Sequence, residues 1–262
     1  MTIKLHYGLR SPSGFSSLLS PTAGYPVSNT SVTPIRKPWL SSVAANGVND
    51  DWIEHDFGSS SSIAAVCLQS VLLASGTVKT GASTPPATTY GTIGPTTVAT
   101  DRHGIRKGSF ATAITARYVR LDLTNAVDAR AAGVYAAYSS GLMEVGAMYV
   151  FASTLVLPKQ ALIGPSVEYM YPEGKENLPN GQFLKFARGA PRARVRLDFL
   201  PAATDDIEQA ARFAKDALCW LDLGVANRPE LQWPVRFLEA EHNRALYPQT
   251  RDRVSLVFDE VT

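Results

Sequence analysis

The sequence predicts a mainly β protein with an N-terminal β-sandwich followed by a smaller α+β domain. Residues 52–58 and 117–123 each alternate large apolar with polar side chains, which is the pattern of a half-buried strand. Only 18% of the 262 residues are charged, and 17 prolines and 19 glycines divide the chain into short segments. This composition is typical of β proteins, whereas a single segment after residue 203 has helical periodicity.

In the first part, the sequence predicts strands at 52–57, 63–73, 117–123 and 143–151. Gly58 is expected to end the first of these with a turn. The preceding residues 1–35 are rich in Ser, Thr, Pro and Gly and are predicted to form an arm or loop-rich segment. Residues 76–100 carry almost no charge and are expected to form loops or short edge strands. The residues expected to supply the two facing core layers are Trp52, Ile53, Phe57, Tyr118 and Leu121.

In the second part, strands are predicted at 166–171, 182–187, 193–199, 232–240 and 253–260, with one helix among them. Thr204 is a favourable N-cap, Asp205 and Asp206 suit the first turn, and Gly224 is a plausible stop. The apolar face of this helix is Ile207, Ala211, Ala214, Leu218 and Leu221. We therefore predict two domains, residues 1–155 and 156–262.

The net charge and the hydropathy of the sequence limit the classes of function that it can have. The net charge of +2 does not indicate nucleic acid as a partner, and no apolar run approaches the 18 or so residues of a membrane span. The N-terminus lacks the apolar segment of a signal peptide, so synthesis and folding in a cytoplasm are expected. Cys67 and Cys219 fall in different predicted domains and are expected to be buried thiols.

No arrangement of residues predicts catalysis, so the chain is not expected to be an enzyme. Asp101 and His103 place a carboxylate near a histidine, but no G-x-S-x-G motif accompanies them. The pattern around His55 predicts an outward polar position in a strand. No metal-binding spacing of His and Cys occurs, and we predict no catalytic, cofactor-binding or metal-binding residue. Asn49, Asp50 and Asp51 are expected to form a solvated turn.

Two clusters in the second part are candidates for an interface between subunits. Arg188, Arg192, Arg194 and Arg196 form a basic series whose last three members alternate with apolar residues. They are expected to form ion pairs across an interface with Asp205, Asp206 or Glu208, or to be a solvated face. The aromatic cluster at 169–172 precedes an expected polar loop at 173–181 and is an interface anchor or core packing.

Four ordered segments resemble the discoidin domain (coagulation-factor type C) over roughly residues 24–152. They are Trp39–Ser42, Trp52–Gly58 with Ile63–Val66, Arg117–Leu121 and Glu144–Val150. The resemblance implies a jelly-roll β-sandwich. Some discoidin-like sandwiches hold a calcium ion, so the resemblance also offers Asn49, Asp50 and Asp51 as calcium ligands, as the alternative to a solvated turn. Secreted members commonly carry a cysteine near each end of the domain, and this sequence has no such pair, which favours assembly in a cytoplasm.

A second resemblance concerns the function. The opening at 24–29 and 38–39 is similar to discoidin-like modules of phage tail proteins, and residues 218–222, 246–248 and 254–261 are similar to the end of tail-tip proteins of long-tailed phages. This implies a virion structural protein of the tail tip or baseplate, assembled in the host cytoplasm. It would form a ring, a hexamer by resemblance, that connects the tail tube to the hub or fibres.

The alternative is a carbohydrate-binding module that recognises a host surface glycan through loops at the end of the sandwich. Sugar sites use exposed aromatic side chains, and the candidates are Tyr25, Tyr90 and Tyr138. A hydrolase with a sandwich appendage is disfavoured because the sequence shows no acid/base pair.

Overall fold

The structure is a computed structural model. It describes residues 2–18, 20–21, 23–31, 39–41, 51–72, 75–93, 106–124, 144–157, 161–170, 173–177, 183–187, 192–199, 217–224, 231–243 and 253–261. The N-terminal elements are β1 (Lys4–Leu9), β2 (Gly14–Ser17), the 3-10 helix η1 (Val27–Ser31) and β3 (Trp39–Leu40). Next come β4 (Asp51–Ile63), β5 (Ala65–Leu72), β6 (Ser75–Gly81), β7 (Thr88–Ile93), β8 (Arg106–Phe110), β9 (Ile114–Thr124) and β10 (Glu144–Val156). The C-terminal strands are β11 (Ala161–Met170), β12 (Glu173–Asn177), β13 (Phe183–Ala187), β14 (Arg192–Phe199), β15 (Cys219–Asp222), β16 (Gln232–Asn243) and β17 (Arg253–Glu260).

Three sheets contain these strands. A five-stranded sheet has the order β2-β4-β9-β6-β7, and a ten-stranded sheet has the order β11-β14-β17-β16-β15-β1-β10-β5-β8, with β3 also paired to β10. The third sheet is the hairpin β12–β13. The predicted mainly β class is confirmed, and each predicted strand segment overlaps a strand over its described residues, with 63–73 divided between β4 and β5 at Ala64.

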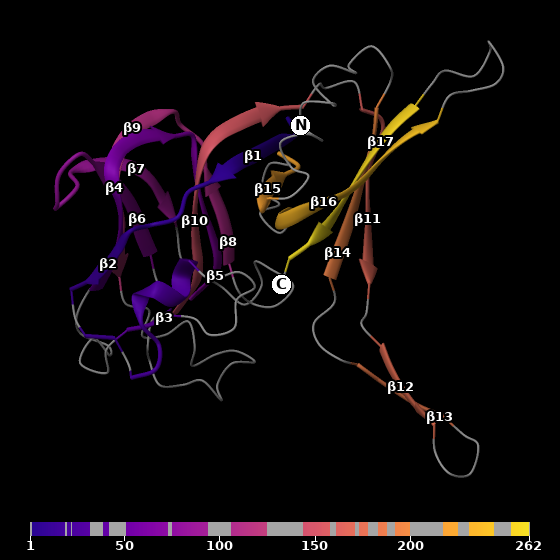
Figure 1. Ribbon diagram of the computed structural model, residues 1–262, viewed down its shortest axis with the longest axis horizontal. Coiled ribbons are helices and arrows are strands. Elements are labelled where there is room, and N and C mark those ends of the chain that lie inside the picture. Colours follow the sequence, from indigo (N-terminus) through magenta and orange to yellow (C-terminus); the bar gives the residue numbers. More distant parts are fainter. Residues whose placement is uncertain are drawn as a thin grey trace.

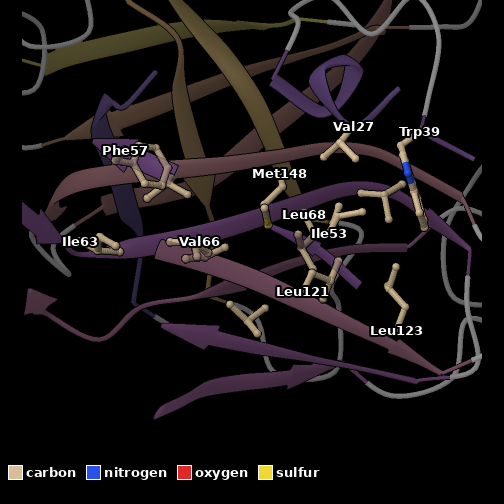
Figure 2. Close-up of a cluster of buried hydrophobic side chains, with 14 of the residues drawn as sticks. Val27, Trp39, Ile53, Phe57, Ile63, Val66, Leu68, Leu121, Leu123 and Met148 are labelled. Carbon is tan, nitrogen blue, oxygen red and sulfur yellow. The ribbon is translucent and has the colours of Figure 1, made fainter. Parts of the chain in front are cut away.

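The sandwich, at the left of Figure 1, is formed where the five-stranded sheet packs on β5 and β10. Its core contains Ile53 from β4, Leu121 from β9, Leu68 from β5 and Met148 from β10 (Figure 2). Trp39 closes one end of this core and is fully buried. The β-sandwich implied by the discoidin resemblance is therefore present, and segments from all four ordered parts of the motif contribute to its core.

The ten-stranded sheet extends beyond the sandwich because β10 is long enough to serve two partners. Its first half pairs with β5 and β3, and its second half pairs with β1. On its other edge β1 pairs with β15, with Leu5 opposite Leu221. The predicted arm at 1–35 is therefore wrong for its first residues, because β1 is an interior strand. The predicted boundary at residue 155 stays a prediction.

Two further apolar clusters hold the rest of the sheet. One, the C-terminal core, includes Leu5, Val195, Leu197, Trp233 and Phe258. The other, the joint core, lies between β5, β10 and β15 and contains Cys67, Tyr149, Phe151 and Trp220. Both cysteines are free and buried as predicted, Cys67 in the joint core and Cys219 in the C-terminal core. Burial raises the pKa of the Cys219 thiol to about 12.

The hairpin β12–β13 projects away from the ten-stranded sheet, beyond the ends of β11 and β14 (Figure 1). Its register runs from Glu173 opposite Ala187 to Asn177 opposite Phe183. Among the described strands it pairs only within itself. The expected polar loop at 173–181 is therefore wrong over Glu173–Asn177, which form a strand.

Two further predictions need correction. Residues 219–222 form β15 rather than the end of the predicted helix, so Leu221 belongs to a strand and Leu218 is buried without regular structure. Residues 201–216, which include the predicted cap and first turns, lie outside the described residues. Gly58 does not end its strand: β4 continues to Ile63, and Gly58, with φ of 76°, lies in a bulge between Asp56 and Ser61.

Candidate functional site: binding and assembly surfaces

The outer face of the five-stranded sheet carries ion pairs between β4 and β9. Glu54 accepts a hydrogen bond from Arg120 Nε at 3.0 Å and another from Thr84 Oγ1 at 3.0 Å. The Arg120 guanidinium stacks on the Trp52 ring, 3.9 Å from its centroid. Trp52 is thus half-buried on the outer face, and its predicted place in the core is wrong. The same holds for Tyr118, which lies under Arg117.

A second ion pair on this face joins Asp56 to Arg117. The carboxylate accepts from Nε at 2.7 Å and from Nη2 at 2.8 Å, which is the bidentate geometry of a strong pair. This hydrogen bonding lowers the pKa of Asp56 below its usual value. Both ion pairs therefore join β4 to β9 across this face.

His55 points into the sandwich, and its predicted outward position is wrong. Only 1% of the residue is exposed, and Nε2 lies 2.7 Å from Thr30 Oγ1. Because Thr30 Oγ1 also donates to the Val27 carbonyl, it accepts from His55, whose ring is therefore protonated at Nε2. Burial lowers the pKa of His55 to about 3, so the imidazole is neutral at ordinary pH.

A hollow of about 180 Å³, which we call the Arg10 hollow, opens beside η1 where β1 leaves β10. Arg10 and Ser11 from the β1–β2 connection, Phe15 from β2 and Ser31 from η1 form its walls, and Met148 and Tyr149 of β10 also line it. Phe15 is 37% exposed, which makes it one of the exposed large apolar side chains among the described residues. The sequence does not mark Arg10 or Phe15 as a site, because a lone Arg and a lone Phe beside a turn have no motif.

A second hollow of about 220 Å³, which we call the Arg194 hollow, lies on the polar face of β11, β14 and β17. Arg194 and Arg196 line it, as the predicted strand alternation requires, while Ala193, Val195 and Leu197 are buried on the opposite face. Arg194 pairs with Asp259 at 2.8 Å, and Arg196 pairs with Asp198 at 3.1 Å. These pairs form within the chain. The expected partners Asp205, Asp206 and Glu208 lie outside the described residues, as does Arg188.

Two of the three aromatic candidates for glycan contact, Tyr25 and Tyr90, are among the described residues. Tyr90 donates its hydroxyl proton to the Thr112 carbonyl at 2.7 Å and packs against the sandwich core. Tyr25 is half-buried, and Tyr138 lies outside the described residues. In the second part, Tyr169 packs on the C-terminal core, so the core-packing alternative holds for this member of the aromatic cluster.

Two absences apply to the described part of the chain. It holds no group of three or more His, Cys, Asp or Glu side chains placed to bind a metal. Of the proposed calcium ligands, only Asp51 is described, and its Oδ1 accepts from the Trp52 amide at 2.7 Å. Within the same described ranges, no helix has the length and apolar character needed to cross a membrane.

Known proteins were compared with this chain by sequence and by structure. No protein-family model matches the sequence, and no curated protein matches it. Chitosan-binding module 1 of a chitosanase/glucanase from Paenibacillus sp. IK-5 is 21% identical, covers 53% of this chain and 93% of its own, and has a TM-score of 0.40.

Two family 32 carbohydrate-binding modules give similar values. The module of AlyQ, solved with 4,5-unsaturated mannuronic acid, is 16% identical over 56% of this chain and 100% of its own, with a TM-score of 0.39. The module of C. perfringens NanJ, solved with galactose, is 9% identical over 53% of this chain and 92% of its own, with a TM-score of 0.38.

Proposed function

We propose that this chain is a non-enzymatic structural protein that assembles with copies of itself in the tail tip or baseplate of a long-tailed phage. The observation that carries the proposal is the hairpin β12–β13, which stands off the body of the molecule (Figure 1). A two-stranded hairpin with five-residue strands is marginally stable alone in water. A neighbouring subunit that packs on it would supply the missing contacts.

The edge of β11 supports the same proposal. β11 is the last strand of the ten-stranded sheet, and none of the described strands pairs with its outer edge. Register shifts between Ala161 and Ser166, together with Pro165, interrupt the first half of the strand, which is how natural proteins protect an edge. The second half, Ser166–Met170, is regular and leads directly toward the hairpin. It is the part of the edge suited to a neighbour.

The virion setting rests on the sequence resemblance of residues 218–222, 246–248 and 254–261 to tail-tip proteins. In this setting the chain is assembled in the host cytoplasm, forms a ring of six copies, and contacts the tube, the hub or the fibres. The closed ring would follow from one interface repeated around an axis.

The experiment is light scattering of the purified protein and of a variant in which residues 172–188 are replaced by a short Gly-Ser linker. We expect a closed oligomer for the native chain and a folded monomer for the variant, with folding checked by circular dichroism. Leu18→Ser, at a 55% exposed position next to β2, is the control and should leave the oligomer intact. A native chain that stays monomeric at high concentration contradicts the proposal, as does a hairpin-deleted variant that still forms the oligomer.

A second candidate function is glycan binding by the sandwich, which would serve host attachment. The observation that favours it is the Arg10 hollow, because an exposed aromatic side chain lies there beside a cation and two hydroxyl groups. A glycan array probed with the full chain tests this function. Binding that is lost when Phe15 is replaced by Ala supports it, and an array with no binding removes it.

A further inference from the structure

The walls of the Arg10 hollow are held in place by a continuous stack of side chains. The Arg10 guanidinium lies over the Phe57 ring, 5.0 Å from its centroid. The ring centroids of Phe57 and the buried His55 are 6.2 Å apart. Those of His55 and Phe15 are 5.1 Å apart, in an edge-to-face arrangement. Because Thr30 fixes His55 from the other side, the exposed Phe15 ring has a defined position. The hollow is therefore built before any ligand arrives.

Arg10 carries a charge that no carboxylate matches in the part of the chain that the structure describes. Its guanidinium donates one long hydrogen bond, 3.4 Å from Nη1 to the Ser62 carbonyl, and no carboxylate pairs with it among the described residues. Other arginines among the described residues each pair with an aspartate or glutamate: Arg117, Arg120, Arg194 and Arg196. An arginine has five N–H donors in a planar fork that fits a carboxylate. Most of that capacity remains at Arg10.

The other walls define what else the ligand must offer. Phe15 presents an aromatic ring, which favours an apolar C–H face, and Ser11 and Ser31 supply hydroxyl groups that pair with other hydroxyl groups. The volume of about 180 Å³ is below the roughly 300–1,000 Å³ typical of sites for drug-sized ligands. The occupant is therefore small, anionic, rich in hydroxyl groups and apolar on one face.

We propose that the Arg10 hollow binds one acidic monosaccharide unit, a pyranose that carries a carboxylate. The carboxylate pairs with Arg10, one face of the sugar ring lies on Phe15, and ring hydroxyls meet Ser11 and Ser31. This assignment rests on the glycan-binding candidate and specifies its ligand as an acidic sugar. It does not depend on self-assembly.

The test is a titration of the full chain with methyl glucuronide, followed by NMR and calorimetry. Methyl glucoside serves as the neutral match, and inorganic phosphate and acetate serve as plain anions. We expect saturable binding of the glucuronide at millimolar concentration, with shifts in the Phe15 ring signals, and at least tenfold weaker binding of the other three. If the glucoside binds as well as the glucuronide, the carboxylate has no role and the proposal is overturned. If phosphate or acetate binds as well, the sugar ring has no role and the proposal is also overturned.

Variants locate the site. Arg10→Gln should weaken glucuronide binding at least tenfold, and Arg10→Lys should give an intermediate loss because the charge stays and the fork is lost. Arg236→Gln, at an exposed arginine on β16, is the matched control and should have no effect. Unchanged binding in Arg10→Gln overturns the proposal.

The outcomes separate this site from the functions proposed above. If the Arg10→Gln variant still binds glycans on the array, the chain is a glycan-binding protein but the Arg10 hollow is not its binding site. The self-assembly proposal is read from light scattering, where Arg10→Gln should behave as the native chain does.

Discussion

The two faces of β4 differ in chemistry, yet both are largely removed from water. The inward face carries Ile53, His55 and Phe57, which pack in the sandwich. The outward face carries Trp52 and Glu54, of which Glu54 is only 4% exposed. The inward face contains a histidine, and the outward face contains a tryptophan. An alternating pattern therefore separates two sets of side chains without telling which set lies inside.

The reason lies in partners that are distant in sequence. Trp52 tolerates the outer face because Arg120, 68 positions later, covers its ring. Glu54 tolerates burial because Arg120, Thr84 and Ser16 donate to it. His55 tolerates the core because Thr30 Oγ1 accepts a hydrogen bond from its Nε2–H. In each case, a contact with a residue distant in sequence decides which side chain can be buried, and the alternation along the strand carries no information about that contact.

The largest test of this comparison is the pair of substitutions Trp39→Ala and Trp52→Ala. Trp39 is fully buried in the sandwich core, so its truncation should lower the free energy of unfolding by about 3–5 kcal/mol. Trp52 lies on the outer face and should lose about 1 kcal/mol, mainly from its contact with Arg120. Urea unfolding measures both. Equal losses would mean that the outer face is packed like the core.

The next effect concerns Glu54→Gln. The side chains of Glu54 and Arg120 are 5% and 12% exposed, so removing the carboxylate leaves a buried guanidinium without its counter-charge. We expect a loss of about 3 kcal/mol in unfolding free energy. The double variant Glu54→Gln, Arg120→Met should recover part of it. A loss below about 1 kcal/mol would show that water reaches this pair.

Acid should act mainly through the inward face. The pKa of His55 falls from 6.5 to about 3 on folding, so the native state binds fewer protons than the unfolded state between these values. Stability from this group is complete above pH 6.5 and declines as the pH falls, by about 1.4 kcal/mol per pH unit.

His6 contributes in the same direction, because burial followed by the charge of Lys4 lowers its pKa to about 4. Unfolding free energies measured at pH 7 and pH 5.5 should differ by about 1–3 kcal/mol from both groups. His55→Gln should reduce the slope. A slope unchanged in that variant would place the acid sensitivity elsewhere.

The smallest effect should come from Asp259→Asn in the Arg194 hollow. The side chains of Arg194 and Asp259 are 37% and 30% exposed, so solvent screens the pair and its loss should cost less than about 1 kcal/mol. Thermal unfolding would detect it as a small shift. A loss as large as that of Glu54→Gln would mean that the hollow is closed in the assembled protein.

The sequence was sufficient for the sandwich and for strands such as 117–123 and 193–199, because these segments carry strong alternation that their tertiary setting preserves, but β1 and β12 were missed. It was not sufficient at 219–222, where helical spacing of Leu218 and Leu221 competes with pairing to β1 and β16. The Arg10 hollow could not be predicted, since its residues come from β1, β2, η1 and β10. The arginine series at 192–196 suggested a basic surface, but Asp198 and Asp259 neutralise two of its members.

The position of β1 between β10 and β15 has a consequence for the order of folding. Leu5 pairs with Leu155 and with Leu221, so the second ladder joins residues more than 200 positions apart. Such non-local pairing slows folding. During synthesis at roughly 5–20 residues per second, β1 would wait roughly 10–40 s after its own emergence for β15. Both edges of β1 are open until β10 is made, and the edge that pairs with β15 stays open for the whole interval.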